Sequence, residues 1–340
     1  MATNRNSYTL TDILGEPLTK QEALTYVRTN TDATTYQRFI QMDVAYREKL
    51  LRFIMGKNGL SITYDEVFRY VMMPGGTTSR LEKFLSAILG ESVTIEQLLP
   101  REGTLLYEEG SFVIADIVVR LKTGSTVNVE IQKIGYMFPG ERSSCYTADM
   151  IMRQYNYLKN SNSNFTYKLM KPVYLIVFME NSPELFHVTK EYIHKKVSNF
   201  NTGIQLNLLD NIYYIALDTF RSLSQNIRTE QDAWLKFLTE DDPDEIVHFV
   251  NDFPEFLPCY HDLIEFRHNP KEMIFLFSEA LKKMDRNTER YMVEELNKKV
   301  NNLMDQNSEL QNTNSKLQSC ISEKDAIIQE LKQKLAQNNL

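Results

Sequence analysis

Asp116, Glu130 and Gln132 are the residues of this sequence whose types and spacing are best suited to chemistry. They lie in two stretches rich in β-branched residues, FVIADIVVRL (112–121) and TVNVEI (126–131), which are separated by a run typical of a turn. This pattern predicts a β-hairpin with Asp116 on its first strand and Glu130 on its second. Because side chains alternate along a strand, Glu130 and Gln132 are expected to share one face.

Two carboxylates brought together from adjacent strands can hold a divalent cation. Asp116 and Glu130 would supply hard oxygen ligands, and their like charges would otherwise repel each other at close range. The bound ion would lower the pKa of a water molecule and neutralise the charge that builds up on a phosphate. A hairpin with one hydrated face would also carry acids at these positions, so the spacing alone leaves both interpretations open.

The cysteines and histidines do not suggest a different metal. Cys145, Cys259 and Cys320 lie far apart without a CxxC pair, and the five histidines are scattered. This argues against a disulfide framework and against a structural zinc site. Any metal should therefore have carboxylate ligands, which points to Mg²⁺ or Mn²⁺.

The charge is distributed unevenly along the chain. The net charge is −7, but residues 229–340 carry 13 basic and 22 acidic residues and so contribute −9 by themselves. Residues 101–228, which include the candidate acids, carry 14 basic and 12 acidic residues. The overall acidity therefore does not exclude DNA as a partner of the middle segment.

Nothing in the sequence suggests a membrane partner. It contains no run of 18 or more apolar residues, and residues 1–28 are polar and mixed in charge. We expect a soluble protein of the cytoplasm.

The elements around the hairpin predict an α/β fold. Apolar periodicity favours helices over about 19–56, 64–72, 79–89 and 141–158, and again from residue 229 onward. The uninterrupted apolar run at 173–179 is typical of a buried central strand, and 212–217 adds another. The order of helix, hairpin, helix and buried strand predicts a mixed sheet flanked by helices.

The last fifty residues have the most regular pattern. Two interleaved series of positions seven residues apart hold Leu296, Leu303, Leu310, Leu317, Lys324 and Leu331, and Val300, Asn307, Asn314, Ile321, Ile328 and Leu335. A core asparagine pairs best with its own copy and fixes the register of a two-stranded coil. The pattern predicts a parallel coiled-coil homodimer, with a single hydrated helix as the alternative.

Several segments of the sequence resemble a known family. The segments ITYDEVFRYVM (62–72), FVIADIVVRL (112–121), NVEIQKIGYMFPGERSSCYTADMIMRQY (128–155) and KPVYLIVF (171–178) resemble the PD-(D/E)XK nuclease family transposases, a group related to the Rpn recombination-promoting nucleases. The resemblance continues in the same order through LNLLDNIYYIALDTFR (206–221), AWLKFL (233–238) and ALKKMDRNTERYMVEEL (280–296).

The resemblance implies a restriction-endonuclease-like core and gives each candidate residue a role. The metal-binding aspartate of the family falls on Asp116, and the acid of its E-x-Q motif falls on Glu130. Gln132 takes the place of the lysine in the commoner E-x-K version, and it would orient the attacking water. Lys133 should not substitute for that lysine, because the alternation along the strand points it to the opposite face.

A third metal ligand is implied upstream of the hairpin. It falls on Asp65, in the D-x-x-F pattern at the start of the helix expected over 64–72, with Glu66 or Glu109 as alternatives.

The helix after the motif could bind the substrate. Arg142, Tyr146 and Arg153 recur at steps of four and seven, which places them on one helix face, and Arg142 matches an arginine of the family. Its guanidinium could bind a phosphate through two hydrogen bonds. An ordinary polar face is the alternative, with Arg153 paired to Asp149.

Together these features predict four parts: an N-terminal helical segment (1–60), a PD-(D/E)XK nuclease-like core (61–228), a helical region (229–290) and a coiled coil (291–340). The expected function is Mg²⁺- or Mn²⁺-dependent hydrolysis of DNA, linked to recombination or mobile elements, that leaves a 5′ phosphate and a 3′ hydroxyl. Two alternatives stay open. One is a degenerate nuclease fold that only binds DNA or acts through its coiled coil, and the other is a nuclease for RNA, although no RNA-binding module is recognisable.

Overall fold

The computed structural model describes residues 7–60, 62–101, 115–133, 135, 138–198, 200–223, 227–282 and 286–338. By packing, the chain divides into two compact units, Met1–Lys283 and Met284–Leu340. The finer division of the sequence at residues 60, 228 and 290 stays a prediction.

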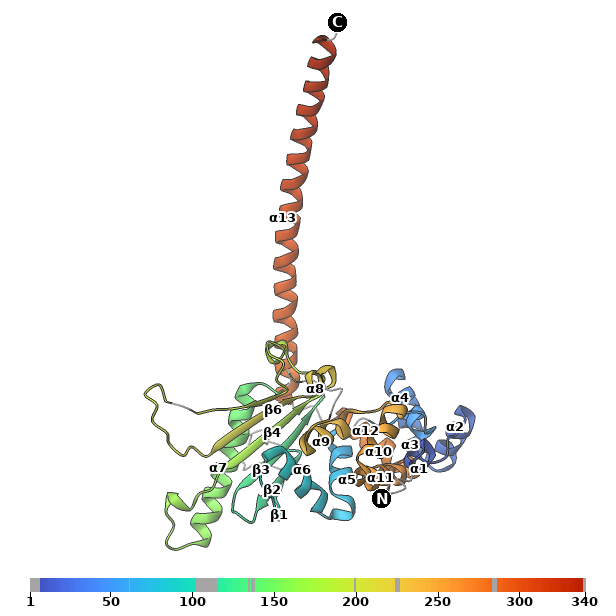
Figure 1. Ribbon diagram of the computed structural model, residues 1–340, viewed down its shortest axis with the longest axis vertical. Helices are drawn as coiled ribbons and strands as arrows, with labels where there is room; N and C mark the ends of the chain where they lie inside the picture. Colours follow the sequence, from blue (N-terminus) through green and yellow to red (C-terminus); the bar gives the residue numbers. More distant parts are fainter. Residues whose placement is uncertain are drawn as a thin grey trace, which may run out of the picture. The chain divides into compact units, whose positions relative to one another are not determined.

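The first unit is built around a mixed sheet. Six strands are seen in the described residues, in the spatial order β1-β2-β3-β4-β6-β5 (Figure 1). The bounds are β1 (Ile95–Leu98), β2 (Ile117–Leu121), β3 (Thr126–Gln132), β4 (Val173–Met179), β5 (Ile193–Lys195) and β6 (Asp210–Ala216). β3, β4 and β6 run parallel to one another, whereas β1, β2 and β5 pair antiparallel with their neighbours.

Helices surround this sheet and continue into a helical region beside it (Figure 1). In the first unit they are α1 (Leu10–Leu14), α2 (Lys20–Thr29), α3 (Ala33–Gln41), α4 (Val44–Ile54), α5 (Asp65–Met72), α6 (Ser79–Leu89), α7 (Gly140–Ser161), α8 (Leu217–Leu223), α9 (Glu230–Thr239), α10 (Pro243–Asp252), α11 (Leu257–His268) and α12 (Pro270–Lys282). The predicted α/β architecture, a mixed sheet flanked by helices, is confirmed.

The alternation along β3 separates two hydrophobic cores. Val127, Val129 and Ile131 face the larger core, which includes Phe68 of α5 and Phe84 of α6 and continues through the other helices of the first unit except α7. The other face of the sheet packs against α7 in a smaller core. Asn128, Glu130 and Gln132 alternate with these valines and isoleucine, so they lie on the α7 side.

The expected helix over 19–56 is divided into three helices. α2, α3 and α4 each begin after a side chain that accepts a hydrogen bond from the first turn, supplied by Thr19, Asp32 and Asp43. Such caps satisfy the free N–H groups at a helix start, so each of these residues favours a new helix over the continuation of the last. The apolar spacing concealed these breaks because it continues across them.

The sheet also differs in detail from the prediction. β2 begins at Ile117, so Asp116 lies one residue before the strand, and the first three residues of the strand expected over 112–121 lie outside the described residues. The two edge strands β1 and β5 were not predicted. They are four and three residues long, and buried and exposed residues do not alternate along them. The alternating apolar pattern that marks a strand in a sequence is therefore missing.

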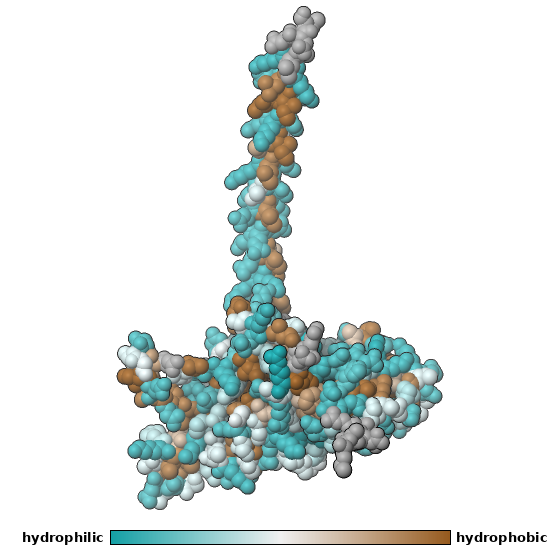
Figure 2. Space-filling model, in the orientation of Figure 1, coloured by the Kyte–Doolittle hydropathy of each residue, from teal (hydrophilic) through white to brown (hydrophobic). Residues whose placement is uncertain are grey.

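The second unit contains α13 (Arg286–Asn338), a single helix of 53 residues. Apolar side chains form a line along it in Figure 2, and those at the predicted core positions are 46–66% exposed, from Leu296 to Leu331. The predicted heptad stripe is therefore present on one helix, and its pairing with a second copy stays a prediction. Among the described residues, none of the helices is both long and apolar enough to span a membrane.

Candidate active site

Asp116 and Glu130 lie side by side where β2 begins and β3 ends. The backbone N–H of Asp116 donates to Oε1 of Glu130 at 3.2 Å, and the same oxygen accepts from Nδ2 of Asn128 at 2.9 Å. Oδ2 of Asp116 accepts from the N–H of Ile131 at 2.8 Å. The antiparallel register thus places the two carboxylates against each other, as the hairpin predicted.

Both acids hold their protons unusually tightly. Glu130 is only 1% exposed, and its pKa is raised well above the usual value by burial first and then by the negative charge of Asp116. Burial also raises the pKa of Asp116 to about 7, with a further contribution from Asp65. Ionisation of both carboxyls at once is therefore energetically unfavourable, and a nearby positive charge would reduce this free-energy cost.

Arg101 supplies one such charge from a position that no motif of the sequence marks. Its Nη1 donates to Oε1 of Glu66 at 3.0 Å, and its Nε donates to the carbonyl of Ala115 at 2.9 Å. Its Nη2 lies 3.9 Å from Oδ2 of Asp65 and 4.0 Å from Oδ1 of Asp116. The predicted upstream acid Asp65 and its alternative Glu66 are thereby joined to Asp116 through one guanidinium.

Little in the sequence indicates a role for this arginine. It follows Pro100 directly and belongs to no motif, and its contacts come from α5 and from the residue before Asp116, far apart in the chain. Burial lowers the pKa of Arg101, but Glu66, Asp116 and Asp65 more than offset this and leave the pKa raised.

The start of α7 brings a second arginine to the acids. Nη2 of Arg142 donates to the hydroxyl of Tyr146 at 2.8 Å, and its guanidinium lies 4.7 Å from the centre of the Phe138 ring. The positive charge of Arg142 lowers the pKa of both Asp116 and Glu130, against the larger effect of burial. Arg142 and the buried Tyr146 therefore belong to the same cluster as the acids.

Gln132 and Lys133 lie on opposite faces of the sheet. Nε2 of Gln132 is 3.5 Å from Oε2 of Glu130, a long and weak contact. The ammonium of Lys133 instead pairs with the buried Glu180 and lies 4.3 Å from the centre of the Tyr64 ring. The interactions of Lys133 thus lie away from the acids, as its position along the strand indicates.

The remaining predicted residues are not part of this cluster. Arg153 pairs with Asp149 at 2.7 Å and donates to the carbonyl of Pro100 at 2.7 Å, which is the ordinary salt bridge considered as the alternative. Glu109 lies outside the described residues.

The donor set fits a hard divalent cation better than any other metal. Asp116 and Glu130 offer carboxylate oxygens, and the raised pKa of each means that a bound cation would favour the ionised form of both. Across the described residues, no three Asp, Glu, His or Cys side chains are grouped closely enough to enclose a metal ion. Asp65, the expected third ligand, shares Arg101 with Asp116 instead.

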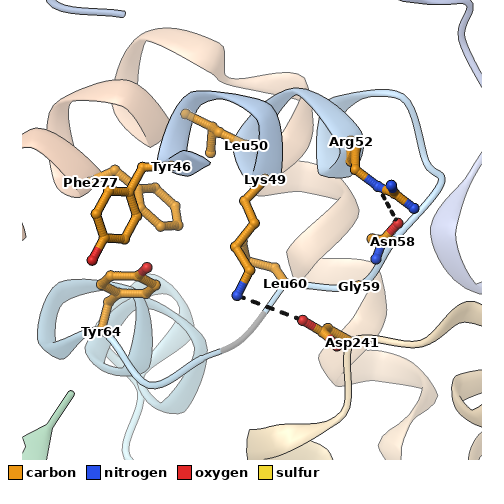
Figure 3. A pocket seen from close by; sticks show the side chains of 10 residues that line it. All are labelled: Tyr46, Lys49, Leu50, Arg52, Asn58, Gly59, Leu60, Tyr64, Asp241 and Phe277. Carbon is orange, nitrogen blue, oxygen red and sulfur yellow. Dashed lines mark hydrogen bonds and ion pairs between the residues drawn. The ribbon is translucent and has the colours of Figure 1, made fainter. Parts of the chain in front are cut away.

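A separate hollow lies beside Tyr64 and has a different character (Figure 3). Its cavity volume is only about 40 Å³, and Tyr64 and Phe277 meet edge to face in it with their ring centres 4.8 Å apart. Lys49 lies 4.0 Å from Asp241, and Arg52 donates to Asn58, so each of its charged groups has a partner within the hollow. None of the acids of the cluster lines it, and the cluster is therefore the better candidate for chemistry.

Comparison with known proteins identifies one family. The sequence profile of a family described as "PD-(D/E)XK nuclease family transposase" matches residues 63–313, which include both acids, Arg101 and Arg142. No curated protein and no solved structure matches the chain.

Proposed function

Because the chain belongs to the PD-(D/E)XK nuclease family transposases, we propose that it is a metal-dependent endonuclease that hydrolyses phosphodiester bonds of DNA. The family ties such an activity to recombination or mobile elements. The observation that carries the proposal is the buried pair of Asp116 and Glu130, whose raised pKa values indicate a site made for a positive ion.

Each residue of the cluster has a role in this proposal. Asp116 and Glu130 would hold Mg²⁺ or Mn²⁺, and Asp65, joined to Asp116 through Arg101, is the proposed third acid. When bound, the ion activates a water molecule and neutralises charge on the phosphate. Gln132, at the partly exposed end of β3, orients the water by a hydrogen bond.

The helix α7 would hold the substrate. Arg142 has its guanidinium fixed against Tyr146 and Phe138, so it can bind a phosphate with little loss of side-chain freedom. Arg153, tied to Asp149 and Pro100, contributes at most a more distant backbone contact. The products are a 5′ phosphate and a 3′ hydroxyl.

Cleavage of a supercoiled plasmid tests the proposal. We expect nicking and linearisation with Mg²⁺ or Mn²⁺, none with EDTA, and a loss of at least about a thousandfold in Glu130→Ala, because the variant loses one of the two carboxylates proposed to hold the ion. Arg80→Gln, which changes an arginine paired with Asp262 away from the acids, should cut like the wild type. A wild-type protein that binds DNA but cuts it with neither metal would leave only the degenerate, binding-only alternative.

We also propose that two chains pair through α13 as a parallel coiled coil. Its line of exposed apolar side chains needs a partner, and Asn307 and Asn314 on that line are best satisfied by their own copies. Two active chains held together could cut both strands of a duplex.

Truncation of the chain at Arg290 tests this pairing. We expect the full chain to sediment as a dimer and the truncated chain as a monomer, because the apolar line from Leu296 onward is then removed. The ratio of linear to nicked plasmid should fall in the truncated chain. A truncated chain that stays dimeric and linearises plasmid as well as the full chain would refute the role of α13.

A further inference from the structure

We propose that Arg101 is the counter-ion of the acid cluster when no metal is bound, and that a divalent cation must displace its guanidinium from Asp65 and Asp116 to bind. This inference rests on the proposed metal-dependent function and adds a residue that controls the affinity for the metal. It starts from the position of Nη2, which lies within 4.0 Å of both carboxylates.

The contacts of Arg101 are of two kinds. The hydrogen bonds to the carbonyl of Ala115 at 2.9 Å and to Glu66 at 3.0 Å have the length of ordinary strong bonds. The distances of 3.9 and 4.0 Å to Asp65 and Asp116 are too long for hydrogen bonds and are purely electrostatic. The bonds to Ala115 and Glu66 hold the guanidinium through Nε and Nη1, so a tilt of the planar group about these two atoms can move Nη2 away from the aspartates while the side chain stays beside the site.

A metal ion and the guanidinium compete for the same charge. Mg²⁺ binds carboxylate oxygens at about 2.0–2.1 Å, so an ion held by Asp116 and Glu130 would draw on the same negative potential that now attracts Nη2. Like charges a few ångströms apart repel strongly in a partly buried site, and the side chain of Arg101 is only 22% exposed. Arg101 thus stabilises the metal-free protein and weakens its affinity for the metal.

The test is the affinity for Mn²⁺, measured by titration calorimetry on the full chain. We expect Arg101→Gln to bind Mn²⁺ about tenfold more tightly than the wild type, because one positive charge beside the ion is removed. Arg101→Lys keeps that charge and should stay within about threefold of the wild type. Without metal, Arg101→Gln should melt at a lower temperature than the wild type, and saturating Mn²⁺ should raise its melting temperature by more.

Arg80→Gln is the matched control. Arg80 is also a partly buried arginine that bridges a carboxylate, Asp262, and a backbone carbonyl, that of Val71, but it touches none of the acids of the cluster. Its loss should lower the melting temperature and leave the affinity for Mn²⁺ unchanged.

The outcomes separate this inference from the proposed function. If the wild type cuts plasmid but Arg101→Gln binds Mn²⁺ no more tightly than the wild type, Arg101 is only a structural brace and the inference is wrong. If the wild type binds Mn²⁺, Arg101→Gln binds it more tightly and neither cuts DNA, the competition between Arg101 and the metal ion is supported and the nuclease proposal fails. If the wild type and Arg101→Gln both fail to bind Mn²⁺, both proposals are overturned.

Discussion

Glu130→Gln should melt at a higher temperature than the wild type in metal-free buffer at pH 8, although it cannot cut DNA. The introduced glutamine keeps an oxygen that can accept from Asn128 and from the N–H of Asp116, so the geometry is retained while the charge is removed. An acid whose pKa is raised by folding destabilises the protein once the pH exceeds its unfolded pKa, because the folded state disfavours the charged form.

The sign of this effect sets the pH window. Near pH 4 the carboxyl is largely protonated in both states and the two proteins should melt at similar temperatures. As the pH rises, the unfolded chain ionises first and the wild type loses stability relative to Glu130→Gln. Each unit of pKa shift corresponds to about 1.4 kcal/mol, and each kcal/mol to about 2–4 °C for a domain of this size.

Thermal melting between pH 4 and pH 8 in EDTA measures this difference. We expect the gap to widen steadily towards pH 8, where the neighbouring Asp116, with a pKa of about 7, is also charged. Addition of Mn²⁺ should stabilise the wild type more than the variant and so reduce the gap. Melting curves that stay a constant distance apart at every pH would show that the charge of Glu130 has no such cost.

Lys133→Met should lower the stability of the protein by about 2–4 kcal/mol and leave the rate of DNA cleavage per folded molecule unchanged. The ammonium pairs with Glu180, which is 7% exposed, and lies 3.4 Å from the hydroxyl of Thr63. Its removal leaves a buried carboxylate whose one remaining cation among the described residues is Arg221, at 3.8 Å. The structural position of Lys133 on the face away from Glu130 is the reason to expect intact catalysis.

A double variant and a surface control complete this experiment. Lys133→Met with Glu180→Gln should regain most of the lost stability, because no unpaired charge is left in the interior. Lys20→Met breaks an exposed pair with Glu48 and should cost less than about 1 kcal/mol. A Lys133→Met protein of normal stability that no longer cuts DNA would assign the lysine to catalysis after all.

The sequence was most informative where one local rule decides the structure. The alternation of TVNVEI placed Glu130 and Gln132 opposite Val129 and Ile131, and the apolar run at 173–179 is the central strand β4. The helix α6 begins and ends where the sequence indicated, at Ser79 and Leu89, since Gly90 adopts the left-handed conformation that ends a helix.

Features that depend on distant contacts were not predictable in this way. The role of Arg101 depends on its contacts with Asp65, Glu66 and Asp116, which come together only in the folded protein. The same is true of Glu180, whose burial against Lys133 and Thr63 leaves no trace in the spacing of residues. Spacing along the chain did place Asp116 and Glu130 together, because the hairpin that joins them is local.

The order of pairing around β3 has a kinetic consequence for the assembly of the site. β2 and β3 are joined by a short turn, whereas β3 and β4 are separated by the whole of α7, so the hairpin can close on a much shorter time scale than the parallel pairing. We therefore expect Asp116 and Glu130 to meet early, while water still surrounds them. The two acids lose that water in the later, long-range step in which α7 and β4 pack against the hairpin. A chain that has not yet reached this step would carry two hydrated acids and no formed site.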